Sequence, residues 1–590
     1  MSKQTASLAP AAAQHESWFS MVIIVLAQFQ MAFNVNAIPV SMGPIVEELG
    51  IPATSVGTAL VVYSLFVAAF VMVGSKLGKI LGARLVFQVT ALLHGGAMAV
   101  MALSRDANGM NLAQALAGLA AAALVPTLVV LIAANYHGAQ QAQALGILAG
   151  TPAISGALAF FVAGLLGTWL SWRYSFGLLF FLSLVVFLLS FRLKPIPRQT
   201  GIKIDFTGAA LAAIGIILLS LGFNNLNAWG ILLAKATAPF NLVGLSPALL
   251  LIVGGLLLLQ AFFAWSHMRS EAGRMPLLSL EVLDSAYERS AVIALLVIGA
   301  LGPAINFMIP LYIQIVQGRT SLFTSVAVVP YTLAIAASAF LIVRLYARLT
   351  PRRIAVVAFV LVAVGLTLLS FTIRNDWGTP LVILGLVIVG LGEGSLLTLL
   401  FNIMVTSSPK ELAGDVGALR GVANNLSTAI GTAFAGVVAV GLLSMMVMNS
   451  LSQSSLPRSL QRQVDLNQIN FISNDQLETV LSETTATPEQ VDEAVALNED
   501  ARVRALRASF LILAGFALLA IIPSLGLPDY SPGEIPEEGV EPGGAVAAGK
   551  RRQTPATRAQ IAARRRRRSW PADRRRTANR RRTHTSRPWP

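Results

Sequence analysis

The chain contains no cysteine, and charged residues make up only 12% of its 590 residues. The absence of cysteine excludes disulfide bonds, thiolate metal sites and cysteine nucleophiles. The scarcity of charge, with 55% hydrophobic residues and a mean hydropathy of +0.70, excludes an ordinary soluble globular chain. A Gly-x-x-x-x-Gly-Lys-Ser/Thr phosphate loop is also missing, which argues against ATP hydrolysis. No Ser/His/Asp or metal-ligand constellation lies outside the apolar runs, so we expect no enzyme, no metal site and no cofactor.

Long apolar runs are what the sequence has in abundance, from Met21 to about Leu527. A bilayer core about 30 Å thick needs roughly 20 helical residues per crossing, and each helix satisfies its own backbone hydrogen bonds. The runs therefore predict an all-α membrane protein with fourteen transmembrane helices. The expected spans are 18–40, 55–75, 84–103, 111–133, 143–168, 174–192, 206–226, 246–267, 291–315, 322–345, 353–373, 379–403, 416–444 and 505–527.

Basic residues between the spans gather on one side of the predicted membrane. By the positive-inside rule that side is cytoplasmic. We therefore expect both termini in the cytoplasm, with residues 1–17 as an N-terminal tail, and the acidic turn of Glu47 and Glu48 outside. The expected location is a bacterial-type inner (plasma) membrane. The basic residues are Lys76, Lys79, Arg84, Arg192, Lys194, Arg198, Lys203, Arg269, Arg274, Arg344, Arg348, Arg352 and Arg353.

Two segments outside the spans are long. The net charge of +15 comes from residues 550–590, which hold sixteen Lys and Arg and one Asp. We expect 528–590 to be a disordered cytoplasmic tail. Its Arg runs attract anionic lipid headgroups by about 1 kcal/mol per residue, and the alternative is an extension with no role in transport. Because the rest of the chain is neutral, no nucleic-acid partner is expected. The polar segment 449–505 is expected outside, as a flexible loop rather than a small amphipathic cap.

The most specific local sequence covers 306–318 and reads Asn-Phe-Met-Ile-Pro-Leu-Tyr-Ile-Gln-Ile-Val-Gln-Gly. A proline follows in the next span, and 171–176 (Ser-Trp-Arg-Tyr-Ser-Phe) and 205–208 (Asp-Phe-Thr-Gly) open two others. These sequences resemble the major facilitator superfamily, in particular its fourteen-helix drug:proton antiporter branch. The resemblance covers nearly all of 17–527.

The resemblance implies a definite architecture. Two six-helix bundles, 18–192 and 291–527, would face each other, with two inserted transmembrane helices in 206–267. Alternating access would follow, because one bundle can rock against the other around a central cavity.

Several charged positions of the family carry other residues here. The loop after the second span has Lys79 where the family has an Asp, beside Gly82 and Arg84, and the resemblance implies that this loop takes part in gating. The family's Asp in the first helix and Arg in the fourth match Asn34 and Gln114. Because amides do not titrate, the usual proton-coupling group is absent.

Three residues inside the spans are candidates for proton coupling. Glu393 lies near the middle of the twelfth span, where an uncompensated carboxylate costs a few kcal/mol, so it is protonated, paired or in a wet cavity. A structural role as a neutral acid bonded to a neighbouring helix is the alternative. Arg420 either reaches Glu393 or extends back to the interface. His94 either takes part in coupling or bonds a backbone carbonyl.

Polar side chains inside the spans are candidates for the wall of a substrate cavity, because amides inside a span must turn toward protein or water. Gln30 and Asn34 are four residues apart and share a helix face. The alternative for each residue is a hydrogen bond between helices, worth about 0.6 kcal/mol. The candidates are Gln30, Asn34, Gln114, Asn306, Tyr312, Gln314, Tyr331, Asn402 and Asn424.

We interpret the chain as a secondary-active transporter of a small organic solute. A wall of amides, aromatics and methionine suits a lipophilic or amphipathic solute better than a highly charged one. The family resemblance favours multidrug-type efflux coupled to protons. Two alternatives remain open: a facilitator without proton coupling, and a transporter-derived membrane sensor or scaffold that no longer transports. We expect a monomer embedded in the lipid bilayer.

Overall fold

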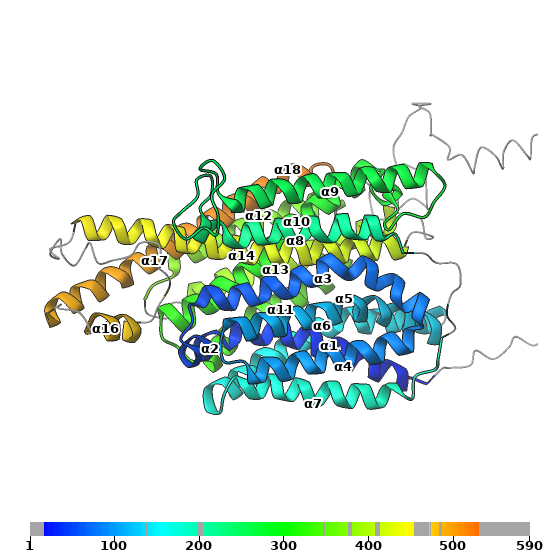
Figure 1. Cartoon of the computed structure of the whole chain (residues 1–590), viewed down its shortest axis with the longest axis horizontal. Helices are drawn as coiled ribbons and strands as arrows, with labels where there is room; N and C mark the ends of the chain where they lie inside the picture. Colours follow the sequence, from blue (N-terminus) through cyan, green and yellow to red (C-terminus); the bar gives the residue numbers. More distant parts are fainter. Residues whose placement is uncertain are drawn as a thin grey trace, which may run out of the picture. The chain divides into compact units, whose positions relative to one another are not determined.

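The chain is almost entirely helical in the computed structural model (Figure 1). The N-terminal and Arg-rich tails that the sequence predicts lie outside the residues that the structure describes, apart from residue 17 and the first two residues of 528–590. The described residues are 17–136, 138–196, 198, 204–345, 348–375, 380–407, 413–453, 471, 474–482 and 487–529.

The helices fall into three groups. The N-bundle consists of α1 (Phe19–Val40), α2 (Met42–Leu49), α3 (Ala53–Leu81), α4 (Ala83–Leu103), α5 (Ala107–Asn135), α6 (Gly138–Trp169) and α7 (Arg173–Ser190). The inserted hairpin consists of α8 (Phe206–Trp229) and α9 (Pro247–Glu271). The C-bundle consists of η1 (Leu280–Leu283), α10 (Ala286–Pro310), η2 (Leu311–Val316), α11 (Ser321–Leu345), α12 (Pro351–Thr372), α13 (Pro380–Ser407), α14 (Ala413–Gln453), α16 (Asn474–Ser482), α17 (Pro488–Leu519) and α18 (Ile521–Ser524).

Thirteen helices of the described residues are long and apolar enough to cross a membrane. The expected span 143–168 lies within α6, whose apolar part among the described residues is Ile154–Trp169. The all-α membrane fold predicted from the apolar runs is confirmed. Each crossing helix buries its backbone hydrogen bonds within itself, as a bilayer requires.

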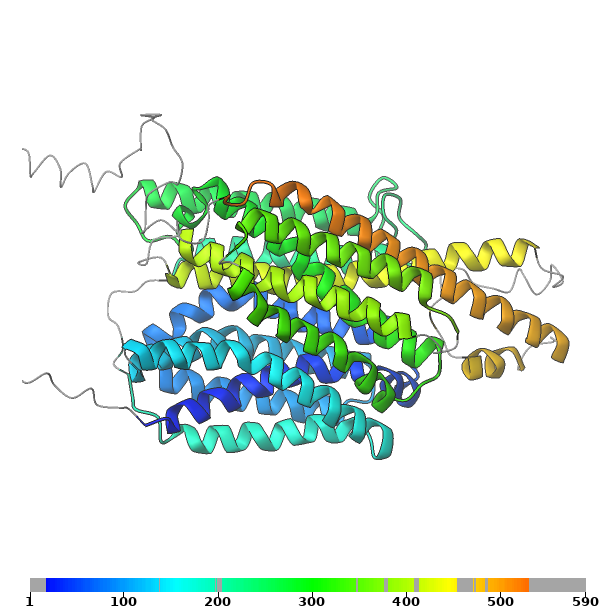
Figure 2. The same ribbon diagram turned by 180° about the vertical axis from the view of Figure 1, so that it is seen from behind.

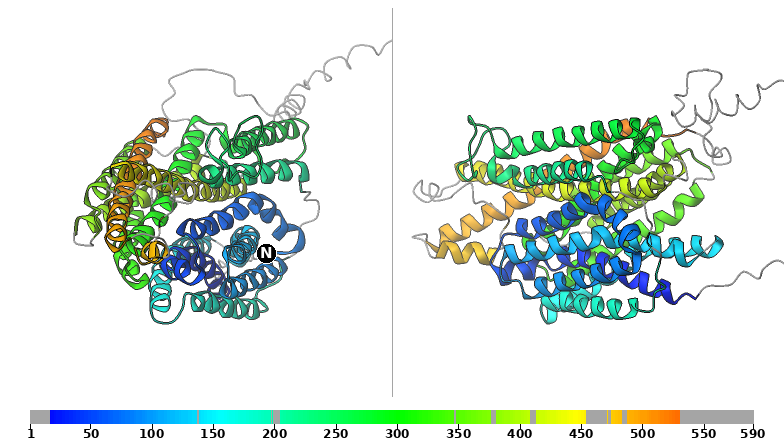
Figure 3. Two further views of the ribbon diagram at one scale, coloured as in Figure 1. Left: turned by 60° about the vertical axis from the view of Figure 1, so that its left-hand side comes forward. Right: turned by 45° about the vertical axis from the view of Figure 1, so that its right-hand side comes forward.

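The bundles lie side by side. Figure 3 shows the blue-to-cyan N-bundle beside the green-to-orange C-bundle, and Figure 2 shows them from behind. The inserted helices α8 and α9 pack on each other, and α8 also lies against α3 of the N-bundle and α14 of the C-bundle. We name the two ends of the bundles by residues that lie there: the Glu48 end and the Arg84 end.

Close helix packing depends on small residues. A Cβ added at Gly118 of α5 would collide with the backbone of Tyr63 in α3, and one at Gly74 of α3 would collide with the backbone of Ala122 in α5. Without a hydrophobic force between helices in lipid, such close approach is a main source of association. The pair α3 and α5 therefore forms a tight unit in the N-bundle.

The predicted gating loop is mostly helix. A loop was expected after residue 75, but α3 continues to Leu81. The chain turns only at Gly82, whose φ of 98° favours glycine. Lys79 is therefore a helical residue, although its side chain lies outside the described part. Arg84, in the first turn of α4, donates from Nη2 to the carbonyl oxygen of Phe191 at 2.8 Å.

Most of the described residues in 449–505 are helical. The end of α14, the short helix α16 and the start of α17 project beyond the bundles at the Glu48 end (Figure 1, yellow and orange). Arg502 of α17 is buried and donates to the side chain of Asn474 of α16. A flexible loop was the favoured expectation here, so the helical extension is a correction.

Candidate functional site

A buried carboxyl lies in the middle of the C-bundle. Glu393 of α13 is only 6% exposed, and its Oε2 accepts a hydrogen bond from the Tyr331 hydroxyl of α11 at 2.5 Å. Among the described residues no Lys, Arg or His forms an ion pair with it. An ionised carboxylate without a cation is costly inside a membrane, although a hydroxyl donor reduces that cost.

Helix α10 passes directly over this carboxyl. A Cβ added at Gly302 would collide with Oε1 of Glu393. Gly394 packs equally closely on the other side, because a Cβ there would collide with the backbone of Ile335 in α11. Small residues on both sides therefore bring α10, α11 and α13 together around the acid.

A narrow pocket borders Tyr331, the hydrogen-bond partner of the acid. Its space of about 220 Å³ includes open solvent, and in this state it is too tight to admit a water molecule. Its wall is mostly apolar, and its polar members include the amide of Asn306 and the Tyr331 ring whose hydroxyl binds Glu393. Phe160 of α6 belongs to the N-bundle, so the pocket lies between the two bundles. The lining residues are Phe160, Ile305, Asn306, Ile309, Pro310, Val328, Tyr331 and Leu386.

The N-bundle holds a pair of amides in its interior. Asn34 of α1 donates from Nδ2 to Oε1 of Gln114 in α5 at 2.9 Å, and Gln114 donates from Nε2 to Oδ1 of Asn34 at 3.2 Å. Both side chains are fully buried. This reciprocal pairing is the hydrogen bond between helices that stood as the alternative to a cavity wall.

A second polar group of the N-bundle joins α1, α4 and α7. The Ser183 hydroxyl donates to Oε1 of Gln30 at 2.8 Å, and Nδ1 of His94 lies 3.4 Å from the same hydroxyl oxygen. Because the hydroxyl donates its own hydrogen to Gln30, its oxygen can accept a hydrogen bond from Nδ1–H of His94. Gln30 and His94 are thus buried in the bundle rather than on its surface.

A glutamine crosses between the bundles at the Glu48 end. Gln314 of η2 accepts from the backbone N–H of Gly43 at 2.5 Å and donates from Nε2 to the carbonyl oxygen of Pro39 at 3.3 Å. These two groups flank Ser41, where α1 ends and α2 begins. Because α1 ends at Val40 and α2 begins at Met42, the Pro39 carbonyl and the Gly43 N–H belong to helix ends, whose backbone groups are left for a partner.

The crossing glutamine stands on a π-helical turn. Such turns are rare and concentrate at functional sites. Tyr312 in the same turn is fully buried; its hydroxyl donates to the carbonyl oxygen of Arg374 at 2.6 Å and accepts from the Arg374 N–H at 3.0 Å. Tyr312 therefore braces the turn within the C-bundle, while Gln314 contacts the N-bundle.

Further contacts join the bundles near the same end. The N–H of Leu322, at the start of α11, donates to the Thr168 hydroxyl of α6 at 3.0 Å. One turn further along α11, Ser325 donates to the carbonyl oxygen of Phe160. The bundles are therefore in direct contact at the Glu48 end.

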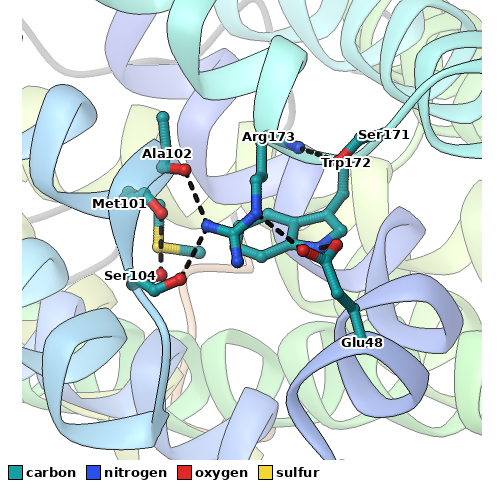
Figure 4. Close-up of polar contacts among 7 residues, drawn as sticks. All are labelled: Glu48, Met101, Ala102, Ser104, Ser171, Trp172 and Arg173. Atoms are coloured by element: carbon teal, nitrogen blue, oxygen red, sulfur yellow. Dashed lines mark hydrogen bonds and ion pairs between the residues drawn. The ribbon is translucent and has the colours of Figure 1, made fainter.

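An arginine clasp holds α2 in the N-bundle (Figure 4). Arg173 at the start of α7 donates from Nε to Oε1 of Glu48 at 2.8 Å, and Trp172 donates from Nε1 to Oε2 at 2.6 Å. Nη1 of Arg173 donates to the carbonyl oxygens of Ala102 and Ser104 at 2.7 and 2.6 Å. The clasp fixes the helix whose first turn Gln314 contacts.

The remaining candidate residues lie apart from the acid and the pocket. Arg420 lies over the Phe401 ring, with its guanidinium carbon 3.7 Å from the ring centroid, and makes no ion pair with Glu393 among the described residues. Asn402 and Asn424 are exposed. These positions are compatible with a cavity wall but are not among the residues that line the pocket.

Sequence reasoning missed Gly302, Phe160 and the clasp. Gly302 and Phe160 matter through their distance to other helices, which no local pattern reveals. The clasp had a signal: Glu48 was expected outside, and the alternation of the predicted spans puts Arg173, between the fifth and sixth, at the same end, where opposite charges attract.

The family is decided by residues 24–432, which match the Major Facilitator Superfamily. This chain is a member of that superfamily. It is therefore a multi-pass membrane transporter and not an enzyme, and the expectation from the sequence is confirmed.

Relatives of this member carry names of antibiotic resistance and export. The puromycin resistance protein pur8 of Streptomyces alboniger is 26% identical over 436 residues, which are 72% of this chain and 82% of that protein. The tetracenomycin C resistance and export protein of Streptomyces glaucescens is 23% identical over 447 residues, with 75% and 79% covered.

Solved structures agree on the fold. A bacterial homolog of the human lysosomal transporter Spinster, in an inward-facing and occupied conformation, matches with a TM-score of 0.53 at 14% identity. The match covers 85% of this chain and 95% of that one.

Proposed function

We propose that this transporter exports a small, largely apolar organic solute and drives export by exchanging protons through Glu393. The observation that carries the proposal is the Tyr331 side chain. Its ring lines the pocket between the bundles, and its hydroxyl donates to the buried carboxyl of Glu393. If the pocket widens when the bundles move, a solute that enters it contacts the group that holds the acid.

Burial of Glu393 controls whether it holds a proton. While the carboxyl is enclosed, its charge is costly, so Glu393 binds a proton. When the bundles part and water reaches the carboxyl, the proton is released. Exchange is coupled only if the solute and the proton each bind one of the two conformations, closed or open, more tightly than the other.

The acid and the contact at the Glu48 end are joined by one helix. Gly302 of α10 packs on Glu393, and α10 continues into η2, which carries Gln314. Small shifts of α10 at the acid therefore change the position of Gln314 against Gly43. We propose that Gln314 closes the Glu48 end in this state and that its release opens that end.

The apolar pocket supports the class of solute. Asn306 offers an amide for one polar group, whereas the other lining side chains offer mainly apolar surface. The relatives named for puromycin and tetracenomycin C are consistent with such solutes. Puromycin and tetracenomycin C are accordingly the first probes to use.

Flux into proteoliposomes tests the proposal. We expect puromycin or tetracenomycin C to accumulate when a pH gradient is applied, and Glu393→Gln to abolish the gradient-driven part. Tyr331→Phe should weaken it, because the acid loses its hydroxyl donor. Glu271→Gln is the matched control: the same chemical change at an exposed acid at the end of α9 should leave flux unchanged.

Three results would contradict the proposal. Gradient-driven flux that survives Glu393→Gln would place proton coupling elsewhere. Flux that ignores the gradient would make the protein a facilitator. Failure of both drugs to move would exclude them from the substrate class.

A facilitator is the second candidate function. The observation that favours it is the neutral Asn34–Gln114 pair, since neither amide titrates. The flux experiment above separates the two functions, because only an exchanger responds to the gradient.

We also propose that the protein lies in a bacterial-type inner membrane as a monomer, with the Arg84 end and both termini in the cytoplasm. The basic residues near the Arg84 end support this orientation. Because the chain lacks cysteine, Lys76→Cys and Arg319→Cys give unique labels. In intact cells an impermeant maleimide should modify residue 319 and spare residue 76; the opposite result would reverse the orientation.

A further inference from the structure

The loop between α8 and α9 exposes an unusual amount of apolar surface. In this apolar loop (230–245), Val243 is 94% exposed and Leu233 is 72% exposed. Single exposed apolar side chains are normal on proteins, but a contiguous set marks a surface that meets a partner. The other large exposed members are Ile231, Leu232, Phe240, Leu242 and Leu245.

The apolar loop has an ordered backbone. The N–H of Ala234 donates to the carbonyl oxygen of Gly244 at 3.0 Å, and the N–H of Ser246 donates to that of Leu232 at 2.8 Å. The Ser246 hydroxyl donates to the carbonyl oxygen of Gly230 at 2.6 Å. Several of its peptide groups are thus satisfied within the loop, which lowers the cost of moving the backbone out of water.

Its tip is strained as well as exposed. Val243 has a φ of 55°, a region that β-branched residues rarely adopt. Such a residue costs of order 1–3 kcal/mol and persists where function requires it. In water this position would combine backbone strain with an exposed valine side chain. Nothing among the described residues covers this side chain.

The apolar loop carries much less charge than the helical extension, which lies at the same Glu48 end. Lys235 is the only ionisable side chain in 230–245, and its Nζ donates to the carbonyl oxygen of Asn227 at 2.9 Å. The helical extension is acidic instead, with Glu478, Asp492 and Asp500 among its residues. The extension suits water, whereas the loop does not.

The position of the loop selects lipid as its partner. It connects the ends of two membrane helices (Figures 1 and 3), so it begins at the surface of the bilayer. Exposed apolar side chains such as Leu256 and Leu257 continue along α9. Only 17% of the 18-residue apolar stretch of this helix is buried in the protein. We propose that the apolar loop is seated at the boundary between headgroups and acyl chains of the adjacent leaflet.

The seat gives the inserted hairpin a fixed depth in the membrane. Apolar elements at this boundary are held by the area that they bury. On the protein side, α8 lies against α3 and α14, and the Thr58 hydroxyl donates to Oδ1 of Asn224 at 3.4 Å. The hairpin therefore links the leaflet to both bundles and stays at a fixed depth while the bundles move relative to it.

Site-specific fluorescence tests the lipid seat without any assumption about substrate. In the naturally cysteine-free chain, Leu232→Cys and Val243→Cys each receive one environment-sensitive dye. The full chain is reconstituted in vesicles of phosphatidylcholine and phosphatidylglycerol, with nitroxide lipids that quench near the headgroup or at mid-chain. Asp492→Cys is the water control, and Leu257→Cys on α9 is the hydrocarbon control.

We expect the dyes at 232 and 243 to emit at shorter wavelength than the dye at 492. The headgroup nitroxide should quench them more than the mid-chain nitroxide does, and the order should be reversed at 257. Emission and quenching equal to those at 492 would overturn the proposal. Stronger quenching at mid-chain would also overturn it, and energy transfer between donor- and acceptor-labelled copies at 243 would replace lipid by a second copy.

Discussion

The N-bundle and the C-bundle stabilise their third membrane helices with the same device. In the N-bundle, Arg173 of the last helix donates to the carbonyl oxygens of Ala102 and Ser104 at the end of α4. In the C-bundle, Arg507 of the last helix donates twice to the carbonyl oxygen of Ile373 at the end of α12, at 3.1 and 2.8 Å. Cations at helix C-termini satisfy free carbonyls and the helix dipole.

The middles of the two bundles differ. The N-bundle holds the amide pair Asn34 and Gln114, which is neutral at every pH and satisfied on both sides. The C-bundle holds Glu393, whose described partner is the Tyr331 hydroxyl. The two bundles thus share the arginine contact at the end of the third membrane helix but differ in their buried polar groups. The N-bundle is a neutral frame, whereas the C-bundle holds an acid beside the pocket.

Placing an acid in the neutral half should have the largest effect. Asn34→Asp buries a carboxylate without a cation, and we expect a loss of about 3–5 kcal/mol, comparable to breaking a buried ion pair. Gln114→Arg should lower the stability by a similar amount. The double variant Asn34→Asp/Gln114→Arg should recover part of the stability, because the two charges can pair. Thermal unfolding in detergent measures each effect.

The matched control for the acid is Asn108→Asp, an exposed position in the first turn of α5. A negative charge there is compatible with water and with the N-terminal end of the helix dipole. We expect no loss of stability there. Equal stability of Asn34→Asp and the parent would show that the N-bundle is not the neutral frame described above.

The shared device should give a smaller effect. Arg173→Lys keeps the charge but loses the planar fork that reaches Glu48, Ala102 and Ser104. We expect a loss of about 1–3 kcal/mol, seen as a lower thermal midpoint. Arg507→Lys in the C-bundle should cost less, because Arg507 serves a single carbonyl. A larger loss for Arg507→Lys than for Arg173→Lys would contradict the comparison between these two arginine contacts.

The contact between the halves should give the smallest effect. Gln314→Ala removes two hydrogen bonds to the N-bundle, and we expect the closed Glu48 end to lose about 1–2 kcal/mol, a factor of roughly 5–30 in population. The labelling rate of Asn306→Cys by a maleimide from that side measures the opening. Arg319→Ala, an exposed change nearby, is the control, and an unchanged rate with Gln314→Ala would contradict the gate.

Most of the architecture could be predicted because apolar length is a local property of the chain. The all-α membrane fold agrees with the structure, in which thirteen helices of the described residues are long and apolar enough to cross a membrane. Glu393 is buried, but its part in proton coupling stays a prediction. The extents of α14 and α17 were missed, since their polar ends continue helices beyond the apolar runs. Arg420 was a possible partner of Glu393 but lies over Phe401, because rotation of α14 decides where its side chain points.

The length of the apolar runs and the scarcity of charge by themselves determined an all-α membrane protein with few buried polar groups. The expectation of a transporter came from the resemblance of its motifs to a known family. Only the tertiary structure decided which of those groups meet. Asn34 and Gln114 are 80 residues apart, and Tyr331 and Glu393 are 62 apart. Their pairing depends on how helices rotate and cross, and on small residues such as Gly302 that permit close approach. These are relations between helices, and no single stretch of sequence contains them.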